Sequence, residues 1–119
     1  MRVLCSHCKQ RYKPNADLLR KANLPADKIK FFYRPPEQAQ NADEDKVCPV
    51  CLGSGYRGRT GVFELLEIDP IREMIRDTPN FNAIRQEAVK HGMKYLQEDG
   101  LRQVIEGKTS IQELLRVCK

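Results

Sequence analysis

The chain has 119 residues, a length that fits one domain or two small ones that share a core. Its net charge is +5 and its mean hydropathy is −0.60. No apolar run approaches the ~20 residues that span a bilayer, and the first residues lack the apolar region of a signal peptide. We therefore expect a cytoplasmic protein, in which cysteine thiols stay reduced.

Two Cys-x-x-Cys pairs are the strongest chemical feature of the sequence. Cys5 and Cys8 form the first pair, and Cys48 and Cys51 form the second after 39 intervening residues. Thiolates three residues apart in a turn point to the same side, so each pair supplies one edge of a tetrahedral S4 site. We expect the four cysteines to bind one structural zinc per chain, since such sites hold mainly zinc or iron. The alternative is a set of free or redox-active thiols.

The segment between the two pairs contains three predicted elements. A short helix is expected at 15–22, capped by Asn15, with leucines on one side. Alternating apolar residues predict a strand at 28–33, which the prolines at 35–36 would end. The polar and acidic residues at 37–46 are typical of a mobile surface loop.

A glycine-rich turn follows the second cysteine pair and exposes two basic side chains. Four glycines within nine residues permit positive φ angles and let the backbone wrap a metal. Arg57 and Arg59 are candidates for binding a phosphate or a carboxylate, although a local ion pair with Glu64 or Glu67 would also explain them. A strand is predicted next, at 62–68.

The remaining sequence predicts four short helices, none of which can bury its apolar face alone. Their expected starts are an Asp69 cap followed by proline, an Asn80 cap, Met93, and a capping box formed by Ser110 and Glu113. Gly92 and Gly107 are expected to end the second and third helices, and Cys118 lies on the apolar stripe of the last helix.

These patterns predict an α+β fold with two parts. Residues 1–58 would form a tetracysteine metal-binding subdomain with short strands, and residues 59–119 would form a bundle of about four short helices.

The run Gly-Lys-Thr-Ser, which begins at Gly107, resembles the end of a phosphate-binding loop, but Arg102 occupies the position where the first glycine of that loop is required. The sequence also shows no arrangement of residues typical of a catalytic nucleophile or an acid–base pair. We therefore expect that this chain is not an enzyme.

The order of motifs resembles the C-terminal end of the type II secretion and type IV pilus assembly ATPases, the general secretion pathway protein E-like traffic ATPases. The resemblance covers nearly the whole chain. It rests on the Cys-Ser-His-Cys-Lys run at 5–9, Phe-Tyr-Arg-Pro at 32–35, the run from Cys48 through Gly-Tyr-Arg-Gly-Arg-Thr-Gly to Leu65, Ile-Arg-Glu at 71–73, and His-Gly-Met-Lys-Tyr-Leu-Gln-Glu-Asp-Gly at 91–100.

The resemblance implies a role inside a larger machine. Members of this family are cytoplasmic hexameric ATPases that power pilus or pseudopilus assembly through an inner-membrane platform. Their phosphate-binding loop lies upstream, so ATP and magnesium would bind outside this chain. The chain would then be an excised part with an artificial start at Met1. Partners would be the rest of the ATPase, its neighbouring subunits and the platform, with contact candidates Arg57, Arg59, Arg72 and Glu73.

Two other functions stay open on the residues alone. Residues 1–60 carry a net charge of +6 while residues 61–119 carry −1, which would suit a zinc ribbon that binds nucleic acid. However, the chain lacks an interleaved basic and aromatic strip, so we expect no nucleic-acid partner. The run that starts at Cys48 also has the Cys-x-x-Cys-x-Gly-x-Gly form of chaperone zinc modules. Those modules carry several copies of this motif, whereas this chain has one.

Overall fold

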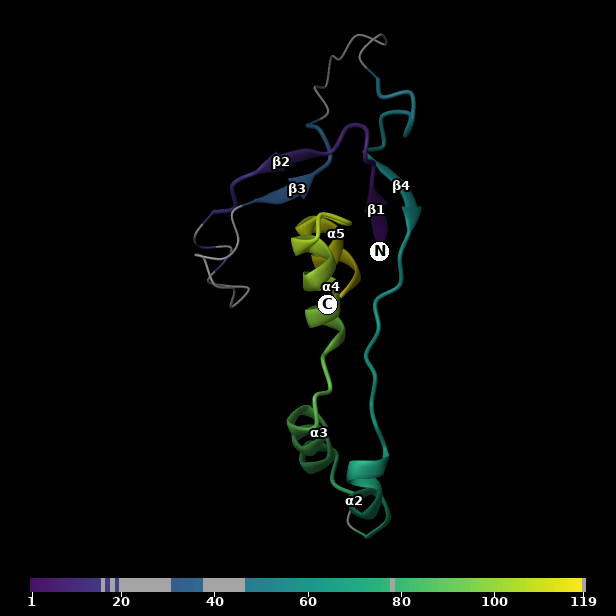
Figure 1. Cartoon of the computed structure of the whole chain (residues 1–119), viewed down its shortest axis with the longest axis vertical. Helices are drawn as coiled ribbons and strands as arrows, with labels where there is room; N and C mark the ends of the chain where they lie inside the picture. Colours follow the sequence, from purple (N-terminus) through teal and green to yellow (C-terminus); the bar gives the residue numbers. More distant parts are fainter. Residues whose placement is uncertain (16, 18, 20–30, 38–46, 78, 119) are drawn as a thin grey trace.

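The structure is a computed structural model that describes residues 1–15, 17, 19, 31–37, 47–77 and 79–118. The molecule is elongated, with principal extents of 65 × 30 × 19 Å. Two small sheets and two helices lie together, and a second pair of helices lies at the far end of the long axis (Figure 1). The fold is α+β, as the sequence predicts.

Two antiparallel two-stranded sheets frame the cysteine pairs. In the first sheet, β1 (Arg2–Leu4) pairs with β4 (Tyr56–Arg59), and the register shifts along the ladder. In the second, β2 (Gln10–Tyr12) pairs with β3 (Phe32–Arg34). The first cysteine pair follows β1 and the second precedes β4, so pairing of these two strands brings the cysteines to one end of the sheet.

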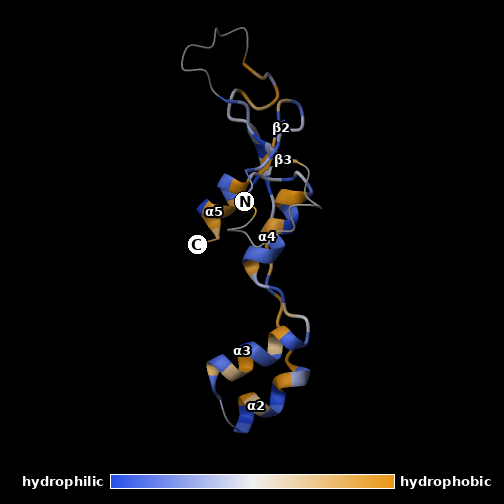
Figure 2. Ribbon diagram, turned by 90° about the vertical axis from the view of Figure 1, so that its left-hand side faces the viewer, coloured by the Kyte–Doolittle hydropathy of each residue, from blue (hydrophilic) through white to orange (hydrophobic). Residues whose placement is uncertain are grey.

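The helices form two separate pairs. Their bounds are η2 (Asp69–Ile71, a 3-10 turn), α2 (Arg72–Asp77), α3 (Phe81–Lys90), α4 (Leu96–Ile105) and α5 (Ile111–Val117). The α4 helix packs on α5 and β3, whereas α2 and α3 pack against η2 (Figure 2). The expected single bundle is therefore replaced by two helix pairs, because extended segments at 61–67 and 93–95 separate them. Among the described residues, none of the helices has the length and apolar character of a bilayer-crossing segment.

The core lies where β3 meets α4 and α5. Phe32 of β3 and Val104 of α4 are both fully buried. They form one cluster with Leu19, Ile111, Leu114 and Cys118. Burial of Cys118 confirms its expected place on an apolar stripe. The predicted boundary between residues 58 and 59 stays a prediction, and this core takes side chains from both sides of it.

The local helix signals were mostly correct. The Asn80 side chain accepts the backbone N–H groups of Asn82 and Ala83 at 3.0 and 3.1 Å. Gly92 and Gly107 follow the ends of α3 and α4 with φ angles of +94° and +70°. These contacts and angles confirm the predicted cap and both predicted ends.

Two helix starts differ from the expectation. Ile68, not Asp69, occupies the cap position before η2, and the Asp69 carboxylate pairs with Arg72 instead. The third helix begins at Leu96 rather than Met93, because the Glu98 side chain accepts the Tyr95 backbone N–H at 3.1 Å and fixes the first turn there.

The capping box at the last helix is half formed. The Ser110 hydroxyl accepts the backbone N–H of Glu113 at 3.2 Å, as predicted. The Glu113 side chain does not accept the backbone N–H of Ser110, which would be the second hydrogen bond of a capping box. It binds Arg2 and Arg116, which are stronger donors because they are charged.

The strand predicted at 62–68 is wrong. This segment pairs with no other described strand, and the strand in this region is β4, which lies earlier in the glycine-rich run. The strand predicted at 28–33 overlaps β3, and its residues 28–30 lie outside the described residues. Most of the predicted helix at 15–22 and nearly all of the predicted loop at 37–46 also lie outside them, although the Asn15 side chain accepts the N–H of Asp17 at 3.1 Å.

Candidate metal centre

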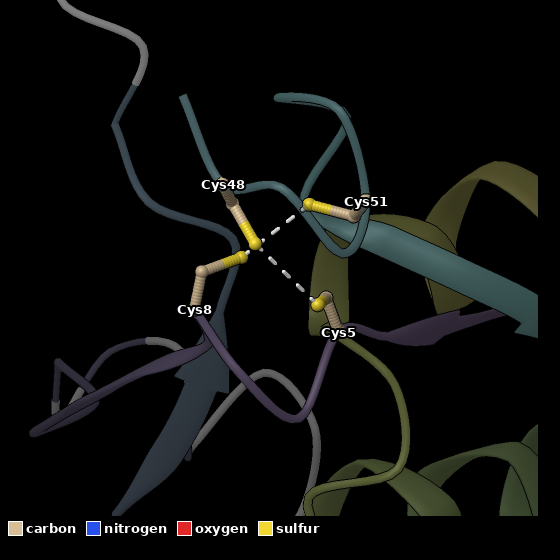
Figure 3. A group of neighbouring side chains, drawn as sticks. All are labelled: Cys5, Cys8, Cys48 and Cys51. Carbon is tan, nitrogen blue, oxygen red and sulfur yellow. Dashed lines mark hydrogen bonds between the residues drawn. The ribbon is translucent and has the colours of Figure 1, made fainter. Parts of the chain in front are cut away.

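The four cysteines of the two pairs converge on one point. Their side chains face one another in Figure 3, and their sulfur atoms all lie within 4.8 Å of each other. The Sγ atoms of Cys5 and Cys48 are 4.0 Å apart, and those of Cys8 and Cys51 are 3.6 Å apart. A tetrahedral site with metal–sulfur distances of about 2.3 Å has sulfur–sulfur edges of about 3.8 Å. The cluster could therefore hold a metal ion with little rearrangement.

The second cysteine pair sits in a turn that only glycine can complete. Gly53 and Gly55 have φ angles of +78° and +71°. The Gly55 N–H donates to the Cys51 sulfur at 3.3 Å, and the Gly55 carbonyl accepts the N–H of Cys5 at 3.0 Å. A Cβ atom on Gly55 would overlap Pro35. This one glycine thus orients a sulfur of one pair and links it to the backbone of the other.

The first cysteine pair is tied to the helical part of the core by Lys9. Its backbone N–H closes the turn on the Cys5 carbonyl at 3.0 Å. Its ammonium group donates to the Gly107 carbonyl at 2.8 Å and lies 4.6 Å from the centre of the Tyr33 ring. A cation at the C-terminal end of α4 is electrostatically favourable. The cysteine turn is therefore anchored to α4 and β3 together.

The thiols of the cluster have shifted acidities. Burial raises the pKa of the Cys8 thiol, and hydrogen bonds to its neighbouring thiols raise it further. Burial also acts to raise the pKa of Cys51, but the Gly55 N–H and the other thiols outweigh it and lower that pKa to about 7. Four sulfur atoms that compete for protons in one partly buried cluster are a donor set that a soft cation satisfies better than protons do.

A buried carboxylate, which the sequence did not single out as a functional group, joins the two ends of the chain. The Glu113 side chain has 0% exposure and accepts both the backbone N–H and the guanidinium of Arg2 at 2.8 Å. Arg116 of α5 donates to the same carboxylate at 2.6 and 2.9 Å. These donors lower the pKa of Glu113 well below its usual range, with the Arg116 bond as the largest cause.

The four contact candidates are not brought together. Arg57 and Arg59 are exposed on β4, whereas Arg72 and Glu73 are exposed at the start of α2. Arg59 stands opposite Arg2 in the β1–β4 ladder. Within the described residues, neither β4 arginine forms the alternative ion pair with a nearby glutamate.

The Gly-Lys-Thr-Ser run joins two helices, as predicted. The Thr109 hydroxyl donates to the Arg2 carbonyl at 2.8 Å, and Ser110 caps α5. Both side chains are fully buried. They are structural residues that hold β1 against the last helix.

Comparison with known proteins identifies the family. The family model described as "Type II/IV secretion system protein" matches residues 1–116. The chain belongs to this family. The match confirms the resemblance that the cysteine and glycine motifs indicated.

The relatives are secretion and pilus ATPases that are much longer than this chain. The type IV pilus assembly ATPase PilB of Thermus thermophilus is 34% identical over 97% of this chain and 12% of its own length. The type II secretion system protein E of Pseudomonas aeruginosa is 33% identical over 100% of this chain and 22% of its own length. The type II secretion system ATPase E of Vibrio cholerae is 30% identical over the same shares. The chain thus spans between 12% and 22% of these curated relatives.

Proposed function

We propose that this chain is a zinc-stabilised, non-catalytic C-terminal module of a hexameric secretion or pilus assembly ATPase. The observation that carries the proposal is the four-cysteine cluster, set between β1 and β4 in a chain that the family model matches from residue 1 to 116. The sequence offers no phosphate-binding loop, so ATP and magnesium would be bound by another part of the ATPase.

Zinc is the metal that these donors suit best. Four cysteine sulfurs are soft ligands, and zinc accepts a tetrahedral S4 set with no geometric preference of its own. Four protein ligands close the coordination sphere, which is typical of a structural site. When bound, the metal would supply a crosslink between the turns at 5–8 and 48–51 and no reaction chemistry.

The module would act by presenting a rigid surface. Gly55 links the two cysteine turns to each other and Lys9 links the first turn to the end of α4, so a metal-bound cluster would hold β1, β4 and α4 in a fixed arrangement. Arg57, Arg59, Arg72 and Glu73 are exposed and would contact neighbouring subunits or the rest of the ATPase. We place the assembled protein in the cytoplasm, against the inner-membrane platform of the machine.

The central test compares two proteins, this 119-residue chain and a longer ATPase that contains it. The short chain should neither bind nor hydrolyse ATP, whereas the longer protein should hydrolyse ATP and assemble as a hexamer. Loss of the cluster by Cys5→Ser with Cys48→Ser should impair assembly of the longer protein without altering its nucleotide-binding residues. ATP hydrolysis by the short chain alone would overturn the proposal.

The role of the arginines needs its own variant. Arg59→Glu in the longer ATPase should weaken hexamer assembly or lower the hydrolysis rate, because it reverses an exposed charge at the proposed contact surface. Lys94→Glu, a charge reversal outside the four proposed contact residues, is the matched control. Unchanged assembly and hydrolysis in the Arg59 variant would remove that residue from the contact surface.

A further inference from the structure

Three arginines line a hollow of about 370 Å³ where β1, β4 and α5 meet (Figure 1). Arg2 belongs to β1, Arg59 to β4 and Arg116 to α5, so the fold collects them from distant parts of the chain. Met1 also lines the hollow, and its amino group donates to the Thr60 carbonyl at 2.8 Å.

The arginines carry more positive charge than their surroundings neutralise. Arg2 and Arg59 stand directly opposite each other in the β1–β4 ladder, where like charges repel. Within the described part of the chain, the one carboxylate that binds these side chains is that of Glu113, which pairs with Arg2 and Arg116. Arg59 has no hydrogen bond or ion pair with any described residue. Three guanidinium groups therefore share a single carboxylate.

Glu113 holds two of the guanidinium groups in fixed positions. Arg2 donates from Nε and Nη2 at 3.0 and 2.8 Å, and its Cζ atom lies 4.2 Å from the centre of the Tyr56 ring. Arg116 donates from its own Nε and Nη2 at 2.9 and 2.6 Å. The Nη1 groups of both arginines have no partner among the described residues, and the two side chains are 47% and 59% exposed. Donors that are fixed in position and still unused can bind a ligand with little loss of side-chain entropy.

A carboxylate is the ligand that matches these donors. The planar guanidinium group binds a carboxylate through two parallel hydrogen bonds, and Glu113 shows that mode of binding in this structure. A hollow of about 370 Å³ has room for more than one such group. The two positive charges that Glu113 leaves unbalanced suit two carboxylates. An acidic protein segment supplies neighbouring carboxylates on one chain, whereas free phosphate is a single small ion.

We propose that the hollow lined by Arg2, Arg59 and Arg116 binds two neighbouring carboxylates of an acidic protein segment. Arg59 contributes an unpaired guanidinium group, and Glu113 is a positioning residue because it orients the other two arginines. The inference deepens the proposed function and rests on it, since the acidic segment would belong to another subunit or component of the secretion or pilus machine. Arg2 and Arg116, which the sequence did not single out, join Arg59 in this site.

Binding of a short acidic peptide to the 119-residue chain tests the site. The probe is an acetylated and amidated peptide of aspartate and glutamate, and calorimetry at low salt measures its affinity. Arg59→Gln should weaken binding by about tenfold or more, because it removes charge-assisted hydrogen bonds.

Arg57→Gln is the matched control for that titration. It removes the same charge from the same strand, at a residue that does not line the hollow. Because the two variants have equal net charge, general attraction of the acidic peptide to a basic protein changes equally in both. Equal weakening by Arg59→Gln and Arg57→Gln would overturn the proposal.

The same titration separates a protein ligand from a free anion. The wild-type chain should bind the acidic peptide more tightly than it binds inorganic phosphate, and it should not bind a peptide of asparagine and glutamine. Inorganic phosphate that binds as tightly as the acidic peptide, and that loses affinity in Arg59→Gln, would overturn the assignment of a protein ligand.

Carbodiimide coupling tests whether the machine supplies the acid. The sample is the longer ATPase in isolated membranes that hold the assembled machine. Arg59→Lys places a primary amine in the hollow, and a carbodiimide joins an amine to a carboxylate that is in direct contact with it. Coupling should link position 59 to an aspartate or glutamate outside residues 1–119 or in a neighbouring subunit, and Arg57→Lys should not give that product. Coupling of position 59 to Glu113 alone would overturn the proposal.

The outcomes for the site and for the proposed function are distinguishable. If the longer ATPase assembles, hydrolyses ATP and holds zinc while Arg59→Gln and Arg57→Gln bind the peptide equally, only the site fails. If the longer protein neither assembles nor hydrolyses ATP while the peptide still distinguishes the two variants, the proposed function fails and the carboxylate site of this chain stands.

Discussion

Glu113 is the residue that joins the beginning and the end of this chain. Its carboxylate receives Arg2 from β1 and Arg116 from α5, and its side chain is fully buried. The carboxylate is buried but the side chains of Arg2 and Arg116 are about half exposed, so loss of one partner should destabilise the fold by less than the ~3–5 kcal/mol of a fully buried pair. The contact therefore determines whether β1, which leads into the first cysteine pair, stays against the last helix.

Stability should depend on the protonation of Glu113. Its folded-state pKa is lowered from an ordinary value of 4.5, so its contribution is fully present above that pH and is lost as the pH falls below it. We expect the free energy of unfolding to fall below pH ~4.5 with a slope of up to about 1.4 kcal/mol per pH unit from this group. Urea unfolding of the wild type at several pH values measures the slope.

The variant Glu113→Gln isolates that contribution. It should be less stable at neutral pH and should show a shallower loss of stability in acid than the wild type. Glu106→Gln, at an exposed carboxylate that pairs with Arg102, is the control and should keep nearly the wild-type profile. Parallel acid profiles for the wild type and Glu113→Gln would show that this carboxylate is not the group that titrates.

Cysteines inside and outside the cluster should behave differently. Cys48→Ser removes a ligand, so the metal content should fall from about one ion per chain to near zero after dialysis against a chelator. Cys118→Ser changes a buried cysteine of the core and should keep the metal, at a cost of about 1–3 kcal/mol for burying a hydroxyl. Elemental analysis with urea unfolding measures both effects. Loss of metal from both variants would contradict the assigned ligands.

At the scale of elements, the glycine turn behind Cys51 gives a second matched comparison. Gly55 and Gly58 both have positive φ, but a Cβ atom on Gly55 would overlap Pro35 whereas one on Gly58 meets nothing within 4 Å. Gly58→Ala should cost about 1–2 kcal/mol from backbone strain. Gly55→Ala should cost about 1–3 kcal/mol more through overpacking and should also weaken metal binding. Similar costs for the two variants, measured by chemical denaturation, would show that the turn can relax.

Elements with local signals were predictable and elements with distant partners were not. The caps at Asn80 and Ser110 use hydrogen bonds two or three residues away, which the sequence shows directly. The β1 and β4 strands are short, and their pairing depends on segments more than 50 residues apart. The strand predicted at 62–68, after the glycine-rich turn, rested on an apolar run that does not alternate strictly, and no described strand lies alongside it.

The candidate site was predictable in part for the same reason. The spacing within each cysteine pair is a local signal, and it correctly indicated that the four sulfurs would meet. The contacts that position them were not visible in the sequence. Lys9 binds Gly107 and Arg2 binds Glu113, which are 98 and 111 residues away in the sequence. The residues around Lys9 and Arg2 do not indicate these partners.

At the scale of the whole molecule, the two helix pairs should differ in stability. The α2 helix has no buried residue and α3 has only Ala88, whereas α4 and α5 each bury several side chains. We expect backbone amides of α2 and α3 to exchange at least about 100-fold faster than those of α4 and α5 in this chain. Uniform exchange rates along all four helices would contradict this division.

X-ray absorption at the zinc edge of the purified chain tests most directly whether the four cysteines hold one zinc ion. The predicted result is about one zinc per chain with four sulfur ligands at about 2.3 Å and no nitrogen or oxygen ligand. A folded, metal-free protein with all four cluster thiols open to titration would contradict it.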